Sequence, residues 1–314
     1  MELPPISGEQ QKIIDLVTSG YNVICDSVAG SGKTTSNLYL ALSKPESKFL
    51  LLTYNSKLKI ETRNKAKLLK LANIEIHSYH AFCVKYYDYN TRTDIHIKKI
   101  LRNNVEKKKI FAFDKIILDE AQDINQLYFE LINKIIKDNS IDTPQLILLG
   151  DKFQCIYGFA GADARYITMA SQVFNCVPEK WINTKLTTSY RVNTQLADFV
   201  NHILLKGDIR INAIKSGSKP IYYIGNAFEN KFMNSYQHDY IIKMLGNGYK
   251  PSDIFILAPS IKSGQSPART LENKIKLLNP EIPVYVPTND DEKLDESIIE
   301  NKLLFSTFHQ AKGL

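Results

Sequence analysis

The feature that most limits how this chain can fold is a glycine-containing turn between an apolar run and a helix-like segment. The turn is residues 27–35 (SVAGSGKTT), and it follows the apolar residues 23–25. Gly30 and Gly32 let successive backbone N–H groups point at phosphate oxygens, and a helix that begins there adds its positive end. We therefore predict a phosphate-binding P-loop, with a ligand-free strand-to-helix turn as the alternative. Ser27 replaces the first glycine of the general pattern, and a small residue still fits there.

Individual side chains of this turn have predicted roles in binding a nucleotide. Lys33 is expected to reach the β- and γ-phosphates of ATP, and the Thr34 hydroxyl is expected to be a ligand of Mg²⁺. The ATP-binding residues predicted in the turn are Ala29, Gly30, Ser31, Gly32, Lys33, Thr34 and Thr35. The sequence thus predicts ATP and Mg²⁺ as cofactors.

Short apolar runs alternate with helical patterns through the first half of the chain. Strands are predicted at 22–25, 49–53, 74–77, 115–118 and 145–149, with helices at 9–19 and 57–71. This alternation is typical of an α/β fold, in which helices cover a parallel sheet. Asp119 and Asp151 stand at the ends of two predicted strands, the edge where ligands of such sheets bind.

The second half repeats the alternation, so we predict two domains, 1–188 and 189–314. Predicted strands in the second domain are 221–224, 254–257, 284–286 and 303–306, and predicted helices are 195–205, 235–246 and 268–278. A lysine-rich segment at about 84–112 interrupts the first domain and is predicted to be a small helical insertion. Its charges indicate either a solvated face or contact with DNA.

Composition restricts the class of protein. The chain has 314 residues, which suggests about two domains, and a formal net charge of +7, which fits a polyanionic partner. The four cysteines have no metal-ligand or CxxC spacing, so we expect free thiols in a reducing compartment. No basic and apolar leader and no apolar run of 18 residues is present. We therefore expect an intracellular, soluble protein that has no membrane partner and is not secreted.

Two adjacent carboxylates close the predicted strand at 115–118. They belong to residues 119–123 (DEAQD). Asp119 is expected to hold Mg²⁺ through water, and Glu120 is expected to orient and deprotonate the water that attacks ATP. The alternative is that these carboxylates only cap a helix.

Three motifs in fixed order resemble the UvrD/Rep/PcrA group of superfamily 1 helicases. They are residues 119–123 (DEAQD), 150–163 (GDKFQCIYGFAGAD) and 188–191 (TSYR), and the resemblance extends from Gln10 to the last residue. It implies two RecA-like P-loop NTPase domains with parallel sheets flanked by helices. It also implies an ATP-dependent DNA helicase or translocase that moves 3′ to 5′, in replication, repair or recombination.

The resemblance assigns further residues to ATP. Gln10 would recognise the adenine and Tyr190 would stack on it. Gln154 would sense the γ-phosphate, and Arg191 would be an arginine finger that domain closure brings to the nucleotide. For Tyr190 and Arg191 the alternative is a core tyrosine beside a surface ion pair.

The same resemblance assigns residues to DNA. They are Tyr54, Asn55 and Lys57 in residues 53–57, Tyr79 and His80 in residues 78–82, Tyr157 and Phe159 in residues 150–163, and His309 and Lys312 in residues 306–314. Gly313, in the last of these motifs, would contact the nucleotide. Aromatic rings suit this role because every base presents a π-face. Each ring is alternatively part of the core, and for Tyr79 alone the core is favoured.

The sequence departs from the group in two places. Residues 306–314 resemble the motif V of the group, and the chain ends in it. Motif VI and its arginine are therefore absent, and the second domain is expected to be incomplete. Either the chain is a fragment or a separate polypeptide supplies the remainder. The large insertion that many relatives carry before motif V is also absent, as in compact relatives. The expected partners are single-stranded and partially duplex DNA; a non-catalytic ATP- and DNA-binding module and an RNA helicase are the alternatives.

Overall fold

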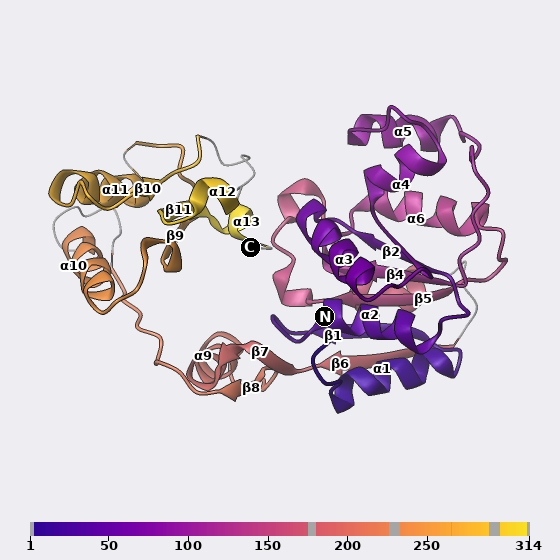
Figure 1. Ribbon diagram of the computed structural model, residues 1–314, viewed down its shortest axis with the longest axis horizontal. Helices are drawn as coiled ribbons and strands as arrows, with labels where there is room; N and C mark the ends of the chain where they lie inside the picture. The colour runs from indigo at the N-terminus through magenta and orange to yellow at the C-terminus, as the bar shows by residue number, and fades with distance from the viewer. Residues whose placement is uncertain (1–2, 175–179, 226–232, 265, 289–295, 313–314) are drawn as a thin grey trace. The chain divides into compact units, whose positions relative to one another are not determined.

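The computed structural model describes residues 3–174, 180–225, 233–264, 266–288 and 296–312. Contacts divide the chain into two compact units, Met1–Pro220 and Ile221–Leu314 (Figure 1). The sequence places the domain boundary after residue 188, whereas the contacts group residues 189–220 with the first unit. The two units are described separately below.

The first unit is built on a six-stranded sheet in which all neighbouring strands run parallel. Its order is β3-β2-β4-β5-β1-β6. The strands are β1 (Asn22–Ser27), β2 (Phe49–Thr53), β3 (Ile74–Ser78), β4 (Lys115–Asp119), β5 (Gln145–Gly150) and β6 (Trp181–Leu186). Because the strands are parallel, the P-loop after β1 and the acidic residues after β4 and β5 meet at one edge of the sheet.

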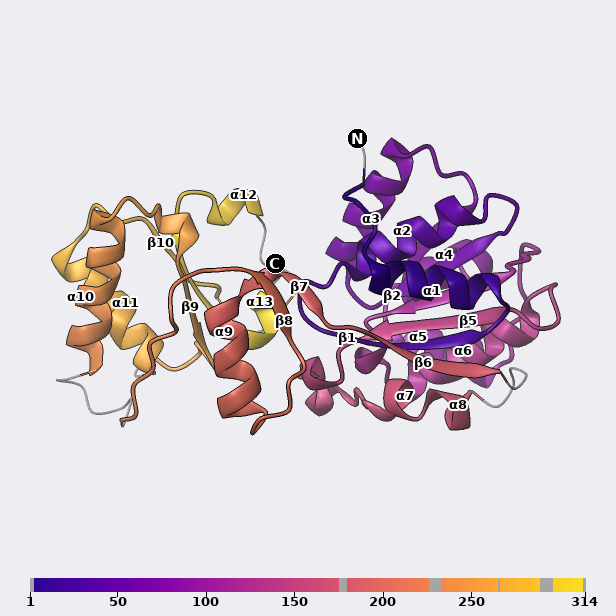
Figure 2. The same cartoon turned by 90° about the horizontal axis from the view of Figure 1, so that it is seen from below.

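Helices cover both faces of this sheet. The helices of the first unit are α1 (Gly8–Thr18), α2 (Lys33–Ser43), α3 (Ser56–Leu68), α4 (Tyr79–Tyr86), α5 (Asp94–Arg102), α6 (Gln126–Asp138), α7 (Arg165–Thr168), α8 (Ala170–Val173) and α9 (Thr194–Phe199). Figure 2 shows α1, α2 and α3 on one side of the sheet, with α7 and α8 on the other. Shorter helical turns are η1 (Ala121–Asp123), η2 (Lys152–Gln154), η3 (Gly158–Ala160) and the π-helical η4 (Val200–Leu204).

Alternation along the strands gives each face its own hydrophobic core. On β4, Ile116 and Leu118 pack with α4, α5 and α6, whereas Ile117 packs with α1 and α2. All three side chains are fully buried, as expected for a strand covered on both faces. The two cores hold the carboxyl ends of the strands in fixed register.

Three strands of the first unit were not predicted. Strand β6 pairs with β1 over its whole length, although its residues are more polar than those of the other strands. After it, β7 (Thr188–Asn193) and β8 (Asn212–Lys215) form a separate parallel pair connected by α9 and η4. Within the predicted insertion, the structure describes the last residues of α4, then α5 and irregular segments around it.

The second unit has a smaller parallel sheet of order β10-β11-β9. Its elements are α10 (Met233–Gly246), η5 (Pro251–Asp253), β9 (Phe255–Ala258), α11 (Pro267–Leu278), β10 (Val284–Tyr285), α12 (Glu296–Ile299), β11 (Leu303–Thr307) and α13 (Phe308–Ala311). Leu271, Ile275, Leu303 and Phe305 belong to its core. The predicted α/β class, with parallel sheets flanked by helices, is confirmed. No helix in the described ranges is both long and apolar enough to cross a membrane.

The strand predicted at 221–224 is wrong. These residues have no strand pairing in the described part of the chain, and Ile224 is 94% exposed. The apolar run does not become a strand because a strand needs a neighbour for its backbone groups. Instead the Tyr223 ring packs on Tyr236 of α10, with ring centroids 4.3 Å apart.

Candidate functional site

The predicted P-loop connects β1 to α2 and has the backbone shape of an anion cradle. Gly30 and Gly32 have φ angles of +71° and +87°, a region that favours glycine. A Cβ atom on Gly30 would stand 2.4 Å from the Arg191 Cβ, and one on Gly32 would stand 2.7 Å from the Gln10 Nε2. Conformation therefore disfavours a side chain at both positions, and at Gly30 the Arg191 Cβ also leaves no space for one.

Lys33, the first residue of α2, faces the carboxylates at the end of β4. Its Nζ lies 3.3 Å from the Glu120 Oε1. Burial acts to lower the pKa of Lys33, but the Glu120 carboxylate, followed by Asp119 and Asp151, outweighs it and raises the pKa. The lysine is therefore held charged at the place where phosphate groups would lie.

Asp119 is 1% exposed, and its Oδ1 accepts no hydrogen bond from the described residues. Burial, and then the neighbouring Glu120 carboxylate, raise the pKa of Asp119 to about 7. Thr34 lies in the first turn of α2, and the buried Ser31 Oγ also has no hydrogen-bond partner within the described ranges. A buried carboxylate oxygen beside a hydroxyl-bearing helix start fits a hard cation such as Mg²⁺.

The raised pKa predicts a pH-dependent cost of the Asp119 charge. Because the folded-state pKa of about 7 lies above the ordinary aspartate pKa of 3.8, the Asp119 carboxylate destabilises the folded protein increasingly as pH rises between these values. We expect Asp119→Asn to gain stability relative to the unaltered protein between pH 5 and pH 8, by roughly 1–4 kcal/mol. Urea unfolding without Mg²⁺ measures this. Asp142→Asn, on an exposed side chain, is the control, and an equal difference at both pH values would contradict the prediction.

Glu120 adopts a φ of +54°, which is unusual for a residue with a side chain and is often found at functional sites. Its Oε2 accepts a hydrogen bond from the Gln122 Nε2 at 2.8 Å. The Gln122 Oε1 in turn accepts the Asp151 N–H at 3.0 Å. Gln122 is fully buried, and thus ties the end of β4 to the end of β5.

Gln122 had no role in the sequence prediction, although it lies inside the motif at 119–123. In the sequence, Gln122 stands out only as a polar residue between acidic ones. That pattern does not show that its side chain bonds to the backbone of residue 151. Gly150 makes the bridge possible, because a Cβ there would stand 2.4 Å from the Gln122 Oε1.

Gln154 lies in the short helix η2 at the end of β5, close to these groups. Its Nε2 donates to the Asp151 Oδ2 at 3.0 Å. Asp151 also caps η2, since its Oδ1 accepts the Phe153 N–H at 3.0 Å. The orientation of the Gln154 amide therefore depends on the Asp151 carboxylate.

Gln10 lies beside the P-loop, as the sequence predicts, but its amide is engaged inside the protein. Its Oε1 accepts the Ser7 N–H at 3.0 Å and its Nε2 donates to the Gly32 carbonyl at 3.3 Å. The side chain closes a capping box at the start of α1. Recognition of adenine by Gln10 stays a prediction.

The segment with Tyr190 and Arg191 is docked on the P-loop backbone. The Ser189 Oγ donates to the Ala29 carbonyl at 2.7 Å, and the Tyr190 N–H donates to the Gly30 carbonyl at 3.0 Å. The Tyr190 ring is 37% exposed. The structure thus brings both residues next to the loop that the sequence assigns to ATP.

Aromatic rings form a continuous series near the candidate nucleic-acid residues. Tyr79 stacks on Tyr128 with centroids 4.4 Å apart, and Tyr54 contacts both Tyr128 and Tyr157. Phe159 lies 6.1 Å from Tyr157 and is 75% exposed. Tyr79 is 2% exposed, so its ring belongs to the core, the alternative that the sequence favours for it.

The exposed Phe159 ring gives a direct test of base stacking. We expect Phe159→Ala to weaken affinity for single-stranded DNA by about 1–3 kcal/mol, the usual contribution of one base–aromatic stack. Fluorescence anisotropy with labelled oligonucleotides measures it. Tyr249→Ala, which removes an exposed ring of the second unit, is the matched control. Equal affinity of both variants would contradict the role of Phe159.

The polar residues predicted to contact DNA already have partners. The Asn55 Oδ1 caps α3 by accepting the N–H groups of Lys57 and Leu58 at 2.8 and 3.3 Å. The His80 Nε2 lies 3.0 Å from the Asp94 Oδ1, which also accepts the Tyr128 hydroxyl at 2.9 Å. Their contact with DNA stays a prediction.

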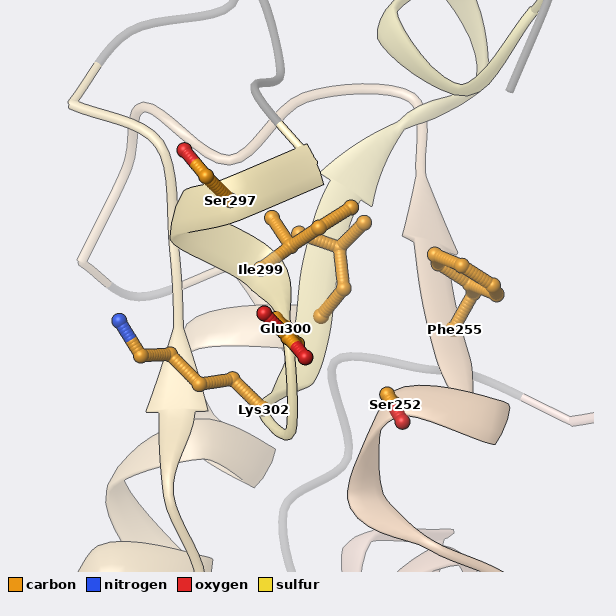
Figure 3. A pocket seen from close by; sticks show the side chains of 7 residues that line it. Ser252, Phe255, Ser297, Ile299, Glu300 and Lys302 are labelled. Carbon is orange, nitrogen blue, oxygen red and sulfur yellow. The ribbon is translucent and has the colours of Figure 1, made fainter.

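In the second unit, the residues predicted from motif V lie at and after α13. Thr307 and Gln310 form a capping box that begins this helix, on which His309 lies, and Lys312 is its C-cap. Gly313 lies outside the described residues. A cavity of about 380 Å³ is lined by Ser252 of η5, Phe255 of β9 and residues of and after α12 (Figure 3). It contains none of the residues predicted to bind ATP or DNA.

Comparison with known proteins gives a family match in the first unit. Residues 95–175 match the UvrD/REP helicase N-terminal domain. A probable DNA helicase II homolog of Mycoplasma capricolum is 29% identical over 187 residues, or 57% of this chain and 24% of that protein. A probable DNA helicase II homolog of Mycoplasma genitalium is 32% identical over 133 residues, or 38% of this chain and 18% of that protein. The chain thus spans about a quarter or less of the length of these relatives.

Among solved structures, one that describes DNA unwinding at forked duplex DNA by two coordinating Pif1 helicases is 16% identical. It covers 81% of this chain and 55% of the other, with a TM-score of 0.42. The family match and the two relatives confirm the resemblance drawn from the motifs. The chain is therefore similar to the UvrD-like helicases of superfamily 1.

Proposed function

We propose that the chain is the motor part of an ATP-dependent DNA helicase or translocase that moves 3′ to 5′ on single-stranded DNA. The observation that supports this most directly is the meeting of Lys33 and Glu120, 3.3 Å apart, beside the glycine cradle. A cation for phosphates and a base for water then lie at one edge of the sheet. The proposal includes both the use of ATP and the direction of movement along the strand.

Each step of ATP hydrolysis has a candidate residue. The Lys33 ammonium would exchange its partner Glu120 for the β- and γ-phosphate oxygens when ATP binds. Glu120 would then be free to accept a proton from the attacking water. Arg191, on the segment docked at Ala29 and Gly30, would approach the γ-phosphate as charge develops on it.

Asp119 and Thr34 would hold Mg²⁺. When bound with ATP, this ion neutralises charge on the phosphate oxygens. The pKa of Asp119, raised to about 7, leaves part of this carboxyl protonated in the empty protein, so loading the site would release a proton.

Coupling to DNA would pass through the segment after β5. Asp151 and Gln154 lie near the carboxylates of β4, while Tyr157 and Phe159 follow within five residues on η3 and its approach. A change in the Gln154 amide on γ-phosphate binding would therefore shift the exposed Phe159 ring. Such gating by local rearrangement is the usual way that nucleotide state reaches a distant ligand.

Strand displacement tests the direction of movement. A duplex with a 3′ single-stranded tail should be unwound with ATP, and a duplex with a 5′ tail should not. Unwinding from the 5′ tail would reject the proposed polarity. Binding of ATP and DNA without turnover would favour a non-catalytic module, and preference for RNA tails would favour an RNA helicase.

A further inference from the structure

Arg210 was assigned no role by any motif, yet it lies between two carboxylates at the ends of strands β1 and β5. Its Nη2 is 2.6 Å from the Asp26 Oδ1 and 2.9 Å from the Asp151 Oδ1. The side chain is 10% exposed, and the guanidinium lies 4.9 Å from the centre of the Phe153 ring. Arg210 is therefore held in a partly buried site between β1, which leads into the P-loop, and the residues that follow β5.

The backbone of Arg210 is held by a separate device. The Asn201 Oδ1 accepts the N–H groups of Arg210 and Ile211 at 3.1 and 3.0 Å, and its Nδ2 donates to the Ile211 carbonyl at 2.9 Å. Asn201 is buried in the π-helical segment η4, an irregularity that is frequent at functional sites. Asn201 thus holds the Arg210 backbone independently of the contacts that the Arg210 side chain makes with the two carboxylates.

Asp151 connects Arg210 to the predicted γ-phosphate sensor. The Asp151 Oδ1 contacts the Arg210 guanidinium and accepts the Phe153 N–H. The Asp151 Oδ2 accepts the Gln154 Nε2. Fixing the carboxylate therefore fixes the Gln154 amide. Asp26 is shared by a second cation, because the Lys152 Nζ lies 3.5 Å from its Oδ2.

Arg210 also belongs to the segment that carries Arg191. Strand β8 begins two residues after Arg210 and pairs with β7, with Ser189 opposite Ala213. A displacement of β7 and β8 would be transmitted to Arg210. The arginine thus links two groups that the proposed function places at the γ-phosphate.

We propose that Arg210 is a positioning residue whose positive charge orients Asp151, and through it Gln154, so that the Arg191 segment and the γ-phosphate sensor respond together. This inference rests on the proposed function for the role of Gln154. The contact itself does not depend on it, and can be tested without ATP.

The test is hydrogen exchange of the Phe153 amide in Arg210→Gln and Arg210→Lys. Loss of the charge should free Asp151 and speed exchange about tenfold in Arg210→Gln. Arg210→Lys should remain within about threefold of the unaltered protein, because Nη2 alone makes both contacts and one ammonium can replace it. Arg165→Lys, in an exposed pair with Asp163, is the control.

Arg210→Gln leaves the Asp26 and Asp151 carboxylates without their shared cation and could destabilise the fold by their repulsion. The double variant Asp26→Asn/Arg210→Gln removes one of these negative charges and still lacks the contact between Arg210 and Asp151. The proposal predicts faster exchange of the Phe153 amide in both Arg210→Gln and the double variant. It also predicts that both variants lose DNA-stimulated ATP turnover by about tenfold and keep their affinity for ATP. Exchange unchanged in these variants, or equally fast in Arg210→Lys, would overturn it. Absence of turnover in the unaltered protein would instead reject the proposed function, and the exchange result would still stand.

Discussion

Replacement of Lys33 by alanine is expected to lower ATP turnover by about 10²–10³-fold, the range seen when one stabilising charge or donor is lost at a reaction centre. Lys33 is buried and is held charged by Glu120, Asp119 and Asp151, so its replacement removes a fixed positive charge from the P-loop. Steady-state phosphate release measures the effect. Circular dichroism should show an unchanged fold, because α2 keeps its packed apolar face.

Lys44→Ala provides the matched control for this prediction. Lys44 is the C-cap of the same helix, and its ammonium lies 3.8 Å from the exposed Glu46 carboxylate. Its removal should leave turnover within about twofold, since surface pairs contribute little. Turnover of Lys33→Ala equal to that of Lys44→Ala would contradict the P-loop assignment.

Replacement of Glu120 by glutamine is expected to lower turnover by about 10²–10⁴-fold, because the amide cannot accept the proton from water. ATP affinity should be retained or increased, since one negative charge beside the phosphates is removed and Lys33 loses its partner. Stopped-flow binding of a fluorescent ATP analogue separates this result from that of Lys33→Ala. Glu46→Gln, on an exposed side chain, is the control.

A Glu120→Gln variant with normal turnover would remove Glu120 from the chemistry and leave its strained backbone without a functional reason. Equal loss of binding and turnover would instead indicate that the amide damages the cradle. Only loss of turnover with binding kept supports the role of a base.

The sequence predicts the edge of the sheet well because that information is local. Apolar runs of three or four residues mark β1, β2, β4 and β5, and the residues after them must stand at the carboxyl edge of a parallel sheet. This places the P-loop, Asp119 and Asp151 together, as the structure shows. The glycines at 30 and 32 then have the positive φ values that the motif requires.

What the sequence could not predict depends on contacts between distant side chains. The hydrogen bond from the Asp151 backbone to Gln122 spans 29 residues, and Arg210 reaches Asp26 across 184. Neither pairing leaves a periodic or compositional signal. Strand β6 was missed for a related reason: its polar residues become a strand only because β1 offers a complete row of backbone partners.

For DNA contact, burial separates residues that sequence alone treats alike. Tyr79 and Phe159 are both aromatic residues in strand-contacting motifs, but one is 2% exposed and the other 75%. A ring can stack on a base only from the surface. The motifs therefore identify the region, and the packing identifies which ring is available.

The measurement that tests the central claim most directly is ATP turnover by this chain alone, with single-stranded DNA, with single-stranded RNA and without nucleic acid. A parallel preparation of Lys33→Ala excludes a contaminating ATPase. We expect turnover that DNA stimulates more strongly than RNA and that the Lys33→Ala preparation lacks. Turnover that DNA does not change, or that persists in Lys33→Ala, would contradict a DNA motor driven from this P-loop.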